Sequence, residues 1–290
     1  MLKEFENYLK NVKKYSINTV NSYVSDINIF ISYLNFEKVN YKNINRDIIR
    51  SYLKYLDDNN YKSSSINRIL SSLNDYYNYL VKNKIIKYNY FSDINRPRKE
   101  KKLPNFINYA EYMNLISTVE KEDNTYLRLR NLLLLEILFD TGLRVSEAIN
   151  IKIKDIDFKN HSIIVLGKGS KERIVYFGDY AFNYLEEYLS LREGIKSLDD
   201  EYLFWNKNYQ KLTRRGAEYL INNIAKKAVL KQKITPHTLR HTFATEMLNN
   251  GCDIRSVQEL LGHKSLSTTG IYTHVTNQVV REEYLKAFKR

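Results

Sequence analysis

The chain has 290 residues, about twice the length of an average domain, so two domains are expected. Hydrophobic residues make up 43% of it and charged residues 27%, which excludes a wholly disordered chain. The longest apolar run, 132–135, is far shorter than the roughly 20 residues of a membrane span, and no signal peptide is expected. Cys252 is the single cysteine, which excludes an internal disulfide framework and a cysteine-based zinc cluster and fits a reducing, cytosolic location.

The chain is basic, with a net charge of +13, and the charge is unevenly spread. Residues 1–104 carry 19 basic and 10 acidic side chains, a net of +9, which leaves 27 and 23, a net of +4, for 105–290. This pattern indicates a polyanionic partner, most often nucleic acid, although charge that serves only solubility would look similar. Tyrosine is abundant, at 25 residues, so any single tyrosine needs local evidence of its own.

The N-terminal third is expected to be helical, because its apolar residues recur at spacings of three and four. Helices are predicted at 19–34, 48–56 and 65–81, after a shorter helix that holds Phe5, Leu9 and Val12. Together they predict a four-helix domain over 1–95. A basic segment with two of the three prolines follows at 96–106, and it is read either as a solvated tether or as a strap along a phosphate backbone.

The remainder, 107–290, is predicted to be mostly helical with a small β-hairpin. Helices are predicted at 108–120, 127–140, 144–150, 179–192, 213–230, 236–249, 254–261 and 277–289. The β-branched runs 161–166 and 173–177 are predicted strands, and the loop between them contains two glycines. Lys168 lies in this loop, which lacks the residue order of a nucleotide-binding P-loop.

A helix start at 235–241 carries the clearest chemical signal. Thr235 is a favourable N-cap and Pro236 suits the first helical position. His237, Arg240 and His241 then share one face near the positive end of the helix, where an anion such as phosphate would bind. A solvated helix start is the plain alternative. A metal pair of His237 and His241 lacks both an intervening glutamate and any cysteine ligand.

Two further segments hold candidate side chains. Asp253 is expected to cap a short helix that Gly262 ends, so His263 lies just past a fixed helix end. Tyr272 follows nine residues later. Upstream, Arg144 comes after the glycine that ends the helix at 127–140, and a structural pair with Glu147 is one interpretation of it.

Five spaced elements occur in order: Arg144 in Thr-Gly-Leu-Arg-Val-Ser-Glu, Lys168 in Gly-Lys-Gly-Ser-Lys-Glu-Arg, His237-Thr-Leu-Arg240, Leu-Gly-His263, and Tyr272 in Ile-Tyr-Thr-His. Over essentially its whole length the chain resembles the tyrosine recombinases of the phage integrase family, within it the Xer-type site-specific recombinases. The resemblance implies a mainly α fold. A helical, SAM-like core-binding domain and a mostly helical catalytic domain with a small antiparallel sheet would form a C-shaped clamp on DNA.

The resemblance also implies a role for each site residue. Tyr272 would attack the scissile phosphate and leave a 3′-phosphotyrosine. Arg144 and Arg240 would donate forked hydrogen bonds to the non-bridging oxygens. Lys168 would be the general acid for the 5′ oxygen. His263 would add a further donor to the phosphate, and His237 would assist phosphate binding or proton transfer, while Glu147 would orient these groups.

On this scheme no metal or nucleotide cofactor is needed. The implied partners are double-stranded DNA with inverted half-sites, a homo- or hetero-tetramer of recombinases that forms a Holliday junction, and an activating protein. The amphipathic helix at 277–289 would pass to a neighbouring protomer or pack on its own core. Three alternatives remain: a type IB topoisomerase, a catalytically silent DNA-binding regulator on the same scaffold, and a generic basic nucleic-acid-binding module.

Overall fold

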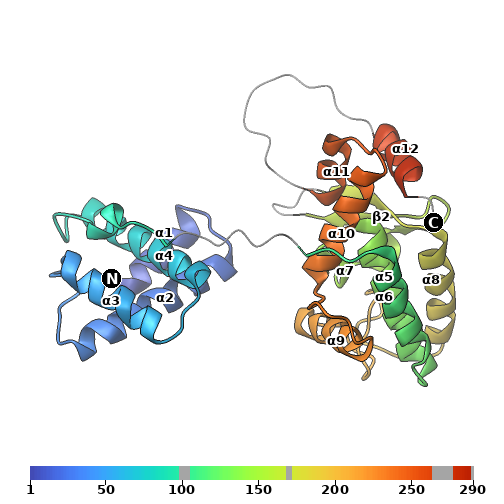
Figure 1. The fold of residues 1–290 in the computed structure, drawn as a ribbon, viewed down its shortest axis with the longest axis horizontal. Helices are drawn as coiled ribbons and strands as arrows, with labels where there is room; N and C mark the ends of the chain where they lie inside the picture. The colour runs from blue at the N-terminus through green and yellow to red at the C-terminus, as the bar shows by residue number, and fades with distance from the viewer. Residues whose placement is uncertain (98–104, 168–171, 263–276, 289–290) are drawn as a thin grey trace. The chain divides into compact units, whose positions relative to one another are not determined.

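The computed structural model describes residues 1–97, 105–167, 172–262 and 277–288 (Figure 1). The chain forms two compact units, Met1–Lys102 and Leu103–Arg290, and each is described by itself. None of the helices in the described ranges combines the length and the apolarity that would be needed to cross a membrane.

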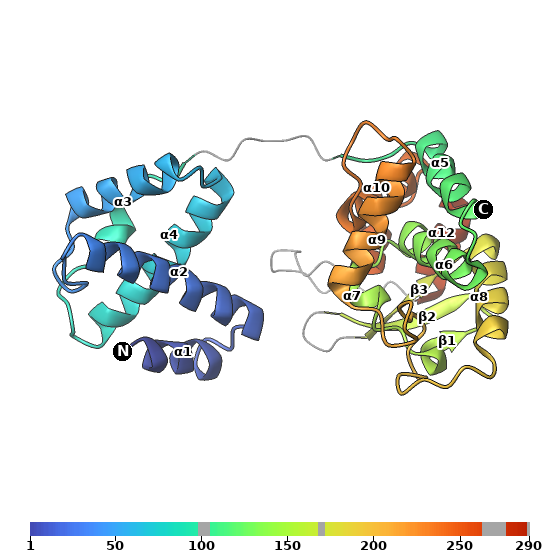
Figure 2. The same cartoon turned by 90° about the horizontal axis from the view of Figure 1, so that it is seen from below.

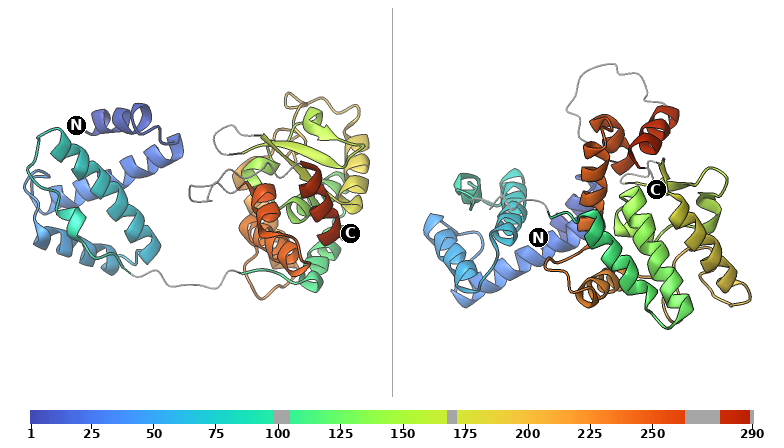
Figure 3. Two further views of the ribbon diagram at one scale, coloured as in Figure 1. Left: turned by 90° about the horizontal axis from the view of Figure 1, so that it is seen from above. Right: turned by 45° about the vertical axis from the view of Figure 1, so that its right-hand side comes forward.

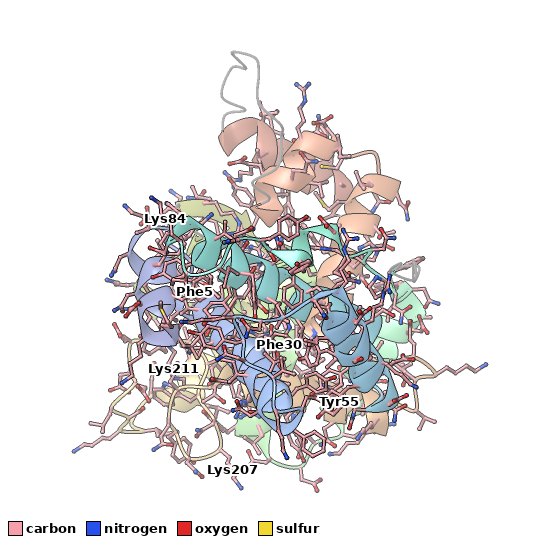
Figure 4. The ribbon with its side chains drawn as sticks, turned by 90° about the vertical axis from the view of Figure 1, so that its left-hand side faces the viewer. Phe5, Phe30, Tyr55, Lys84, Lys207 and Lys211 are labelled. Carbon is pink, nitrogen blue, oxygen red and sulfur yellow. The ribbon has the colours of Figure 1, made fainter. Side chains whose placement is uncertain are left out.

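The N-terminal unit consists of helices, as predicted. They are α1 (Leu2–Asn11), α2 (Ile17–Phe36), α3 (Arg46–Asp58), α4 (Ser63–Lys82) and the short 3-10 helix η1 (Tyr90–Asp93). Their apolar faces share one core, in which Phe5 and Phe30 are fully buried, whereas Tyr55 and Lys84 lie toward the edge (Figure 4). The 3–4 spacing of apolar residues therefore predicted the helices of this unit.

A buried carboxylate joins α2 to α4 inside this unit. Asp26 is 1% exposed, accepts a hydrogen bond from Ser72 Oγ at 3.1 Å, and pairs with Arg68. Burial raises the pKa of Asp26, and the hydrogen bond from Arg68 opposes that rise. The paired guanidinium group thus offsets part of the cost of burying the charge.

The C-terminal unit is mostly helical. Its helices are α5 (Tyr109–Glu120), α6 (Thr125–Thr141), α7 (Val145–Ala148), η2 (Ile153–Asp155), α8 (Asp179–Arg192), α9 (Arg214–Lys227), α10 (Pro236–Asn249), α11 (Ile254–Leu261) and α12 (Asn277–Ala287). Helix α6 is the centre of this unit, because it contacts α5, α8 and α10 and is buried continuously over 129–141 (Figure 2). The apolar run of the sequence is thus the core helix of the unit.

A three-stranded antiparallel sheet lies beside these helices. Its strands are β1 (Ile156–Asp157), β2 (Ser162–Leu166) and β3 (Glu172–Tyr176), in the order β1-β2-β3. The β2–β3 hairpin confirms the predicted pair, with Ile163 opposite Val175 on the buried face. Strand β1 was not predicted, because two residues are too few to show a period.

Helix α12 packs on its own domain in this single chain. It contacts α10, α11 and β3 (Figure 3). Its apolar stripe is buried through Val280 and Tyr284, and Phe288 directly after it stacks on Tyr284. The amide of Asn250 also donates to the Ala287 carbonyl at 2.8 Å. Of the two placements considered for this helix, the single chain shows packing on its own core.

Candidate active site

A small cavity forms where the first residues of α7 and α10 meet. It has a volume of about 160 Å³. Its lining residues are Arg144, Val145, Ser146, Arg214, Pro236, His237 and Arg240. Three residues selected from the sequence, separated by up to 96 positions (240 − 144), therefore lie in one site: Arg144, His237 and Arg240.

Arg144 is placed in the cavity by a sharp helix end. Helix α6 stops at Gly142, whose φ of 58° is the left-handed conformation that glycine adopts most readily. Two residues later Arg144 occupies the N-cap position of α7. The glycine therefore turns the chain out of the core, so that the next helix starts at the cavity.

Glu147 orders the arginines around the cavity. Its carboxylate accepts hydrogen bonds from the backbone N–H and the Nη1 of Arg144, both at 2.9 Å. It also accepts from Nη2 and Nη1 of Arg173, at 2.9 and 3.3 Å. Burial alone would raise the pKa of Glu147, but the hydrogen bonds from Arg173 and Arg144 lower it overall, so this carboxylate is ionised at neutral pH. The suggested pairing of Arg144 with Glu147 is therefore present.

Arg240 is buried beside this group. Its helix, α10, begins at the cavity, where Thr235 caps it by accepting from the Thr238 N–H at 3.2 Å, as predicted. Arg240 donates through Nη1 to the Gly142 carbonyl at 2.8 Å and through Nη2 to the Leu261 carbonyl at 2.6 Å. Burial and then the charge of Arg144 lower the pKa of Arg240 to about 10, so it stays charged at neutral pH.

The cavity is suited to a phosphate group. Arg144, Arg173 and Arg240 bring three positive charges against one negative charge on Glu147, which leaves a local excess of two (3 − 1). The N-terminus of α10 adds the positive end of its helix dipole. His237, in the first turn, is exposed at the cavity wall. His241 is half-buried and is not among the lining residues.

Three predicted site residues, Lys168, His263 and Tyr272, lie outside the described residues. Their flanking segments are described. Strands β2 and β3 border the loop that contains Lys168. Asp253 caps α11 by accepting from the Arg255 N–H at 2.9 Å, and Gly262 ends this helix with a φ of 65°, both as predicted. Their own roles stay predictions.

Two arginines at this site, Arg173 and Arg214, were not predicted from the sequence. Arg173 bonds to Glu147, but in the sequence it is only one of several charges around the hairpin loop. Arg214 lines the cavity from the first turn of α9 and pairs with Glu218 at 2.8 Å. The basic pair 214–215 directly after the Thr213 N-cap was the available signal, because cations are unfavourable at a helix N-terminus unless something else requires them there.

The chain matches two family models, one in each unit. Residues 2–84 match the phage integrase N-terminal SAM-like domain, and residues 105–279 match the phage integrase family. The chain belongs to the phage integrase family. Among curated relatives of this recombinase, the Tyrosine recombinase XerC of Staphylococcus aureus strain JH9 is 43% identical over 286 residues, which cover 99% of this chain and 95% of the relative.

Solved structures of recombinases are also similar to this chain. The XerH site-specific recombinase bound to a palindromic difH substrate is 26% identical, with a TM-score of 0.74, and the match covers 98% of this chain and 81% of that one. The XerA recombinase is 29% identical, with a TM-score of 0.52, and the match covers 100% and 98%. This chain is therefore a tyrosine recombinase of Xer type, an enzyme of site-specific recombination that acts on double-stranded DNA by cleaving and rejoining it.

Proposed function

We propose that this recombinase exchanges strands between two copies of a DNA core site with inverted half-sites, with Tyr272 as its nucleophile. The observation that carries the proposal is the cavity in which Arg144, His237 and Arg240 meet at the start of α10. Its size, its excess positive charge and its forked donors fit one phosphate of a DNA backbone.

The reaction needs three functions at that phosphate. The Tyr272 hydroxyl gives up its proton to a neighbouring base or to water as its oxygen attacks phosphorus, the bond to the 5′ oxygen breaks, and a 3′-phosphotyrosyl linkage forms. Arg144 and Arg240 stabilise the negative charge that builds on the non-bridging oxygens, and His263 adds a donor. Lys168 gives a proton to the leaving 5′ oxygen, and His237 assists phosphate binding or proton transfer. Attack by a second 5′ hydroxyl reverses these steps and joins the new strand.

Strand exchange requires four protomers on two sites and passes through a Holliday junction. In the proposed assembly α12 leaves its own domain for a neighbour, and a second recombinase or an activating protein sets the order of cleavage. The relatives are named as Xer recombinases, and the cellular role that we propose on this resemblance is the resolution of chromosome dimers in the cytoplasm. Integration or excision of a mobile element would use the same chemistry. The DNA target in the cell distinguishes that role from the resolution of chromosome dimers.

A plasmid assay tests this function. A DNA site selected by binding to the protein is placed twice on a supercoiled plasmid, and the products are analysed on gels. We expect deletion or inversion products with the wild type and none with Tyr272→Phe. Relaxed plasmid without recombinant products would instead favour the topoisomerase alternative. Binding without any cleavage would favour the silent scaffold and contradict the proposal.

A further inference from the structure

Arg173 lies at the start of β3, behind the wall of the cavity. Its side chain is 7% exposed, and it is not among the residues that line the cavity. Its Nε donates to the Leu260 carbonyl at 2.7 Å, while Nη2 and Nη1 donate to the two oxygens of Glu147. All three guanidinium nitrogens therefore donate to oxygens of the protein.

Glu147 is shared between Arg173 and the arginines of the cavity. The same carboxylate accepts from Arg144 at 2.9 Å and lies 4.0 Å from Arg240 Nη1. A buried carboxylate must be neutralised, and a carboxylate offers about four acceptor positions. If Arg173 were lost, Glu147 would draw Arg144 and Arg240 toward itself. The arginine forks would then stabilise the carboxylate at the expense of a phosphate in the cavity.

The other contact of Arg173 holds the end of α11. The Leu260 carbonyl accepts a hydrogen bond from Arg173 Nε, and the neighbouring Leu261 carbonyl accepts one from Arg240 Nη2. Gly262 leaves room for this arrangement, because a Cβ atom there would lie 3.1 Å from Nη1 of Arg173. Both arginines therefore donate to carbonyls at the same helix end.

We propose that Arg173 is a positioning residue, which neutralises Glu147 and anchors the end of α11 so that Arg144 and Arg240 are free to bind the scissile phosphate. This inference rests on the proposed function. Lysine cannot replace Arg173 fully, because one ammonium group cannot span Glu147 and the Leu260 carbonyl as the planar fork does.

The first test compares Arg173→Ala and Arg173→Lys with the wild type in single-turnover cleavage of a nicked DNA site at saturating DNA. We expect the alanine variant to cleave about tenfold more slowly or worse, with the lysine variant between, because a charge-assisted contact is weakened. Affinity for DNA should change by less than about threefold, since Arg173 makes no phosphate contact.

Arg192→Lys is the matched control, because Arg192 is also buried and also donates to backbone carbonyls, those of Tyr202 and Leu203. It should cleave at the wild-type rate.

The second test distinguishes positioning from a general loss of structure. A methylphosphonate at the scissile position is neutral, so it has less need of the arginine forks. The ratio of wild-type to Arg173→Ala rates should therefore shrink on this substrate. An equal ratio on both substrates would show a merely structural role and overturn the inference. Cleavage by Arg173→Ala at the wild-type rate would overturn the inference alone, whereas no cleavage by the wild type would overturn the proposed function.

Discussion

The Phe243 ring lies where a side chain on Gly142 would have to be. A Cβ atom at Gly142 would come within 2.4 Å of Phe243 Cδ1 and 2.9 Å of Leu261 Cδ2. Gly142 therefore serves two purposes: it adopts the left-handed conformation that ends α6, and it allows α10 to approach closely. Its carbonyl also accepts from Arg240, so the close approach supports the site directly.

Gly142→Ala should therefore destabilise the protein more than the same substitution at another glycine in the left-handed backbone conformation. We expect a loss of about 2–5 kcal/mol in unfolding free energy, from backbone strain together with the overlap on Phe243. Gly251→Ala is the control, because its φ is 83° but no atom lies within 4 Å of its Cβ position, so only about 1–2 kcal/mol should be lost. Urea unfolding measures both. Equal losses would show that the close approach has no energetic weight.

Arg214→Ala should slow cleavage because this residue lines the cavity that we propose binds the scissile phosphate. At saturating DNA we expect a rate about fivefold to tenfold lower, the value of one charged hydrogen bond at a partly exposed site. In a plot of log affinity against log salt concentration, the magnitude of the negative slope should fall by about one. Arg215→Ala is the neighbouring control, since Arg215 is exposed and does not line the cavity. If Arg214→Ala cleaved DNA at the wild-type rate, Arg214 would have no role in the active site.

The charge of Glu147 should make the free energy of unfolding depend on pH in the acid range. Its pKa is lowered in the folded protein from an ordinary value of 4.5, so its stabilising contribution is complete above pH 4.5 and is lost as the pH falls through the folded pKa. Glu147→Gln should be about 1–3 kcal/mol less stable than the wild type at pH 7. This difference should shrink below pH 4.5. Glu186→Gln, on the exposed face of α8, is the control. A difference that does not change with pH would contradict the charged network.

The helices and part of the site could be predicted because local rules govern them. Apolar spacing located α2, α4 and α6 within a few residues, and the caps Thr235 and Asp253 and the glycine stop at Gly262 were readable one by one.

The contacts of Arg173 could not be predicted from sequence. Its partners are Glu147, 26 positions away, and Leu260, 87 positions away, so only the folded chain brings them together. The two-residue strand β1 exists for a similar reason, because it is defined by pairing with β2 rather than by its own sequence. Local patterns carry no information about such distant contacts.

The most direct test of the proposed mechanism is to identify the residue that becomes linked to DNA. A nicked site that releases a short fragment after cleavage traps the covalent intermediate, and digestion with a protease followed by mass spectrometry locates the modified peptide. We predict that the DNA remnant is carried by Tyr272 among the 25 tyrosines, that Tyr272→Phe gives no adduct, and that Tyr219→Phe, which removes a tyrosine 70% exposed on α9, gives the wild-type amount. An adduct on another residue, or one that persists in Tyr272→Phe, would contradict the proposed mechanism.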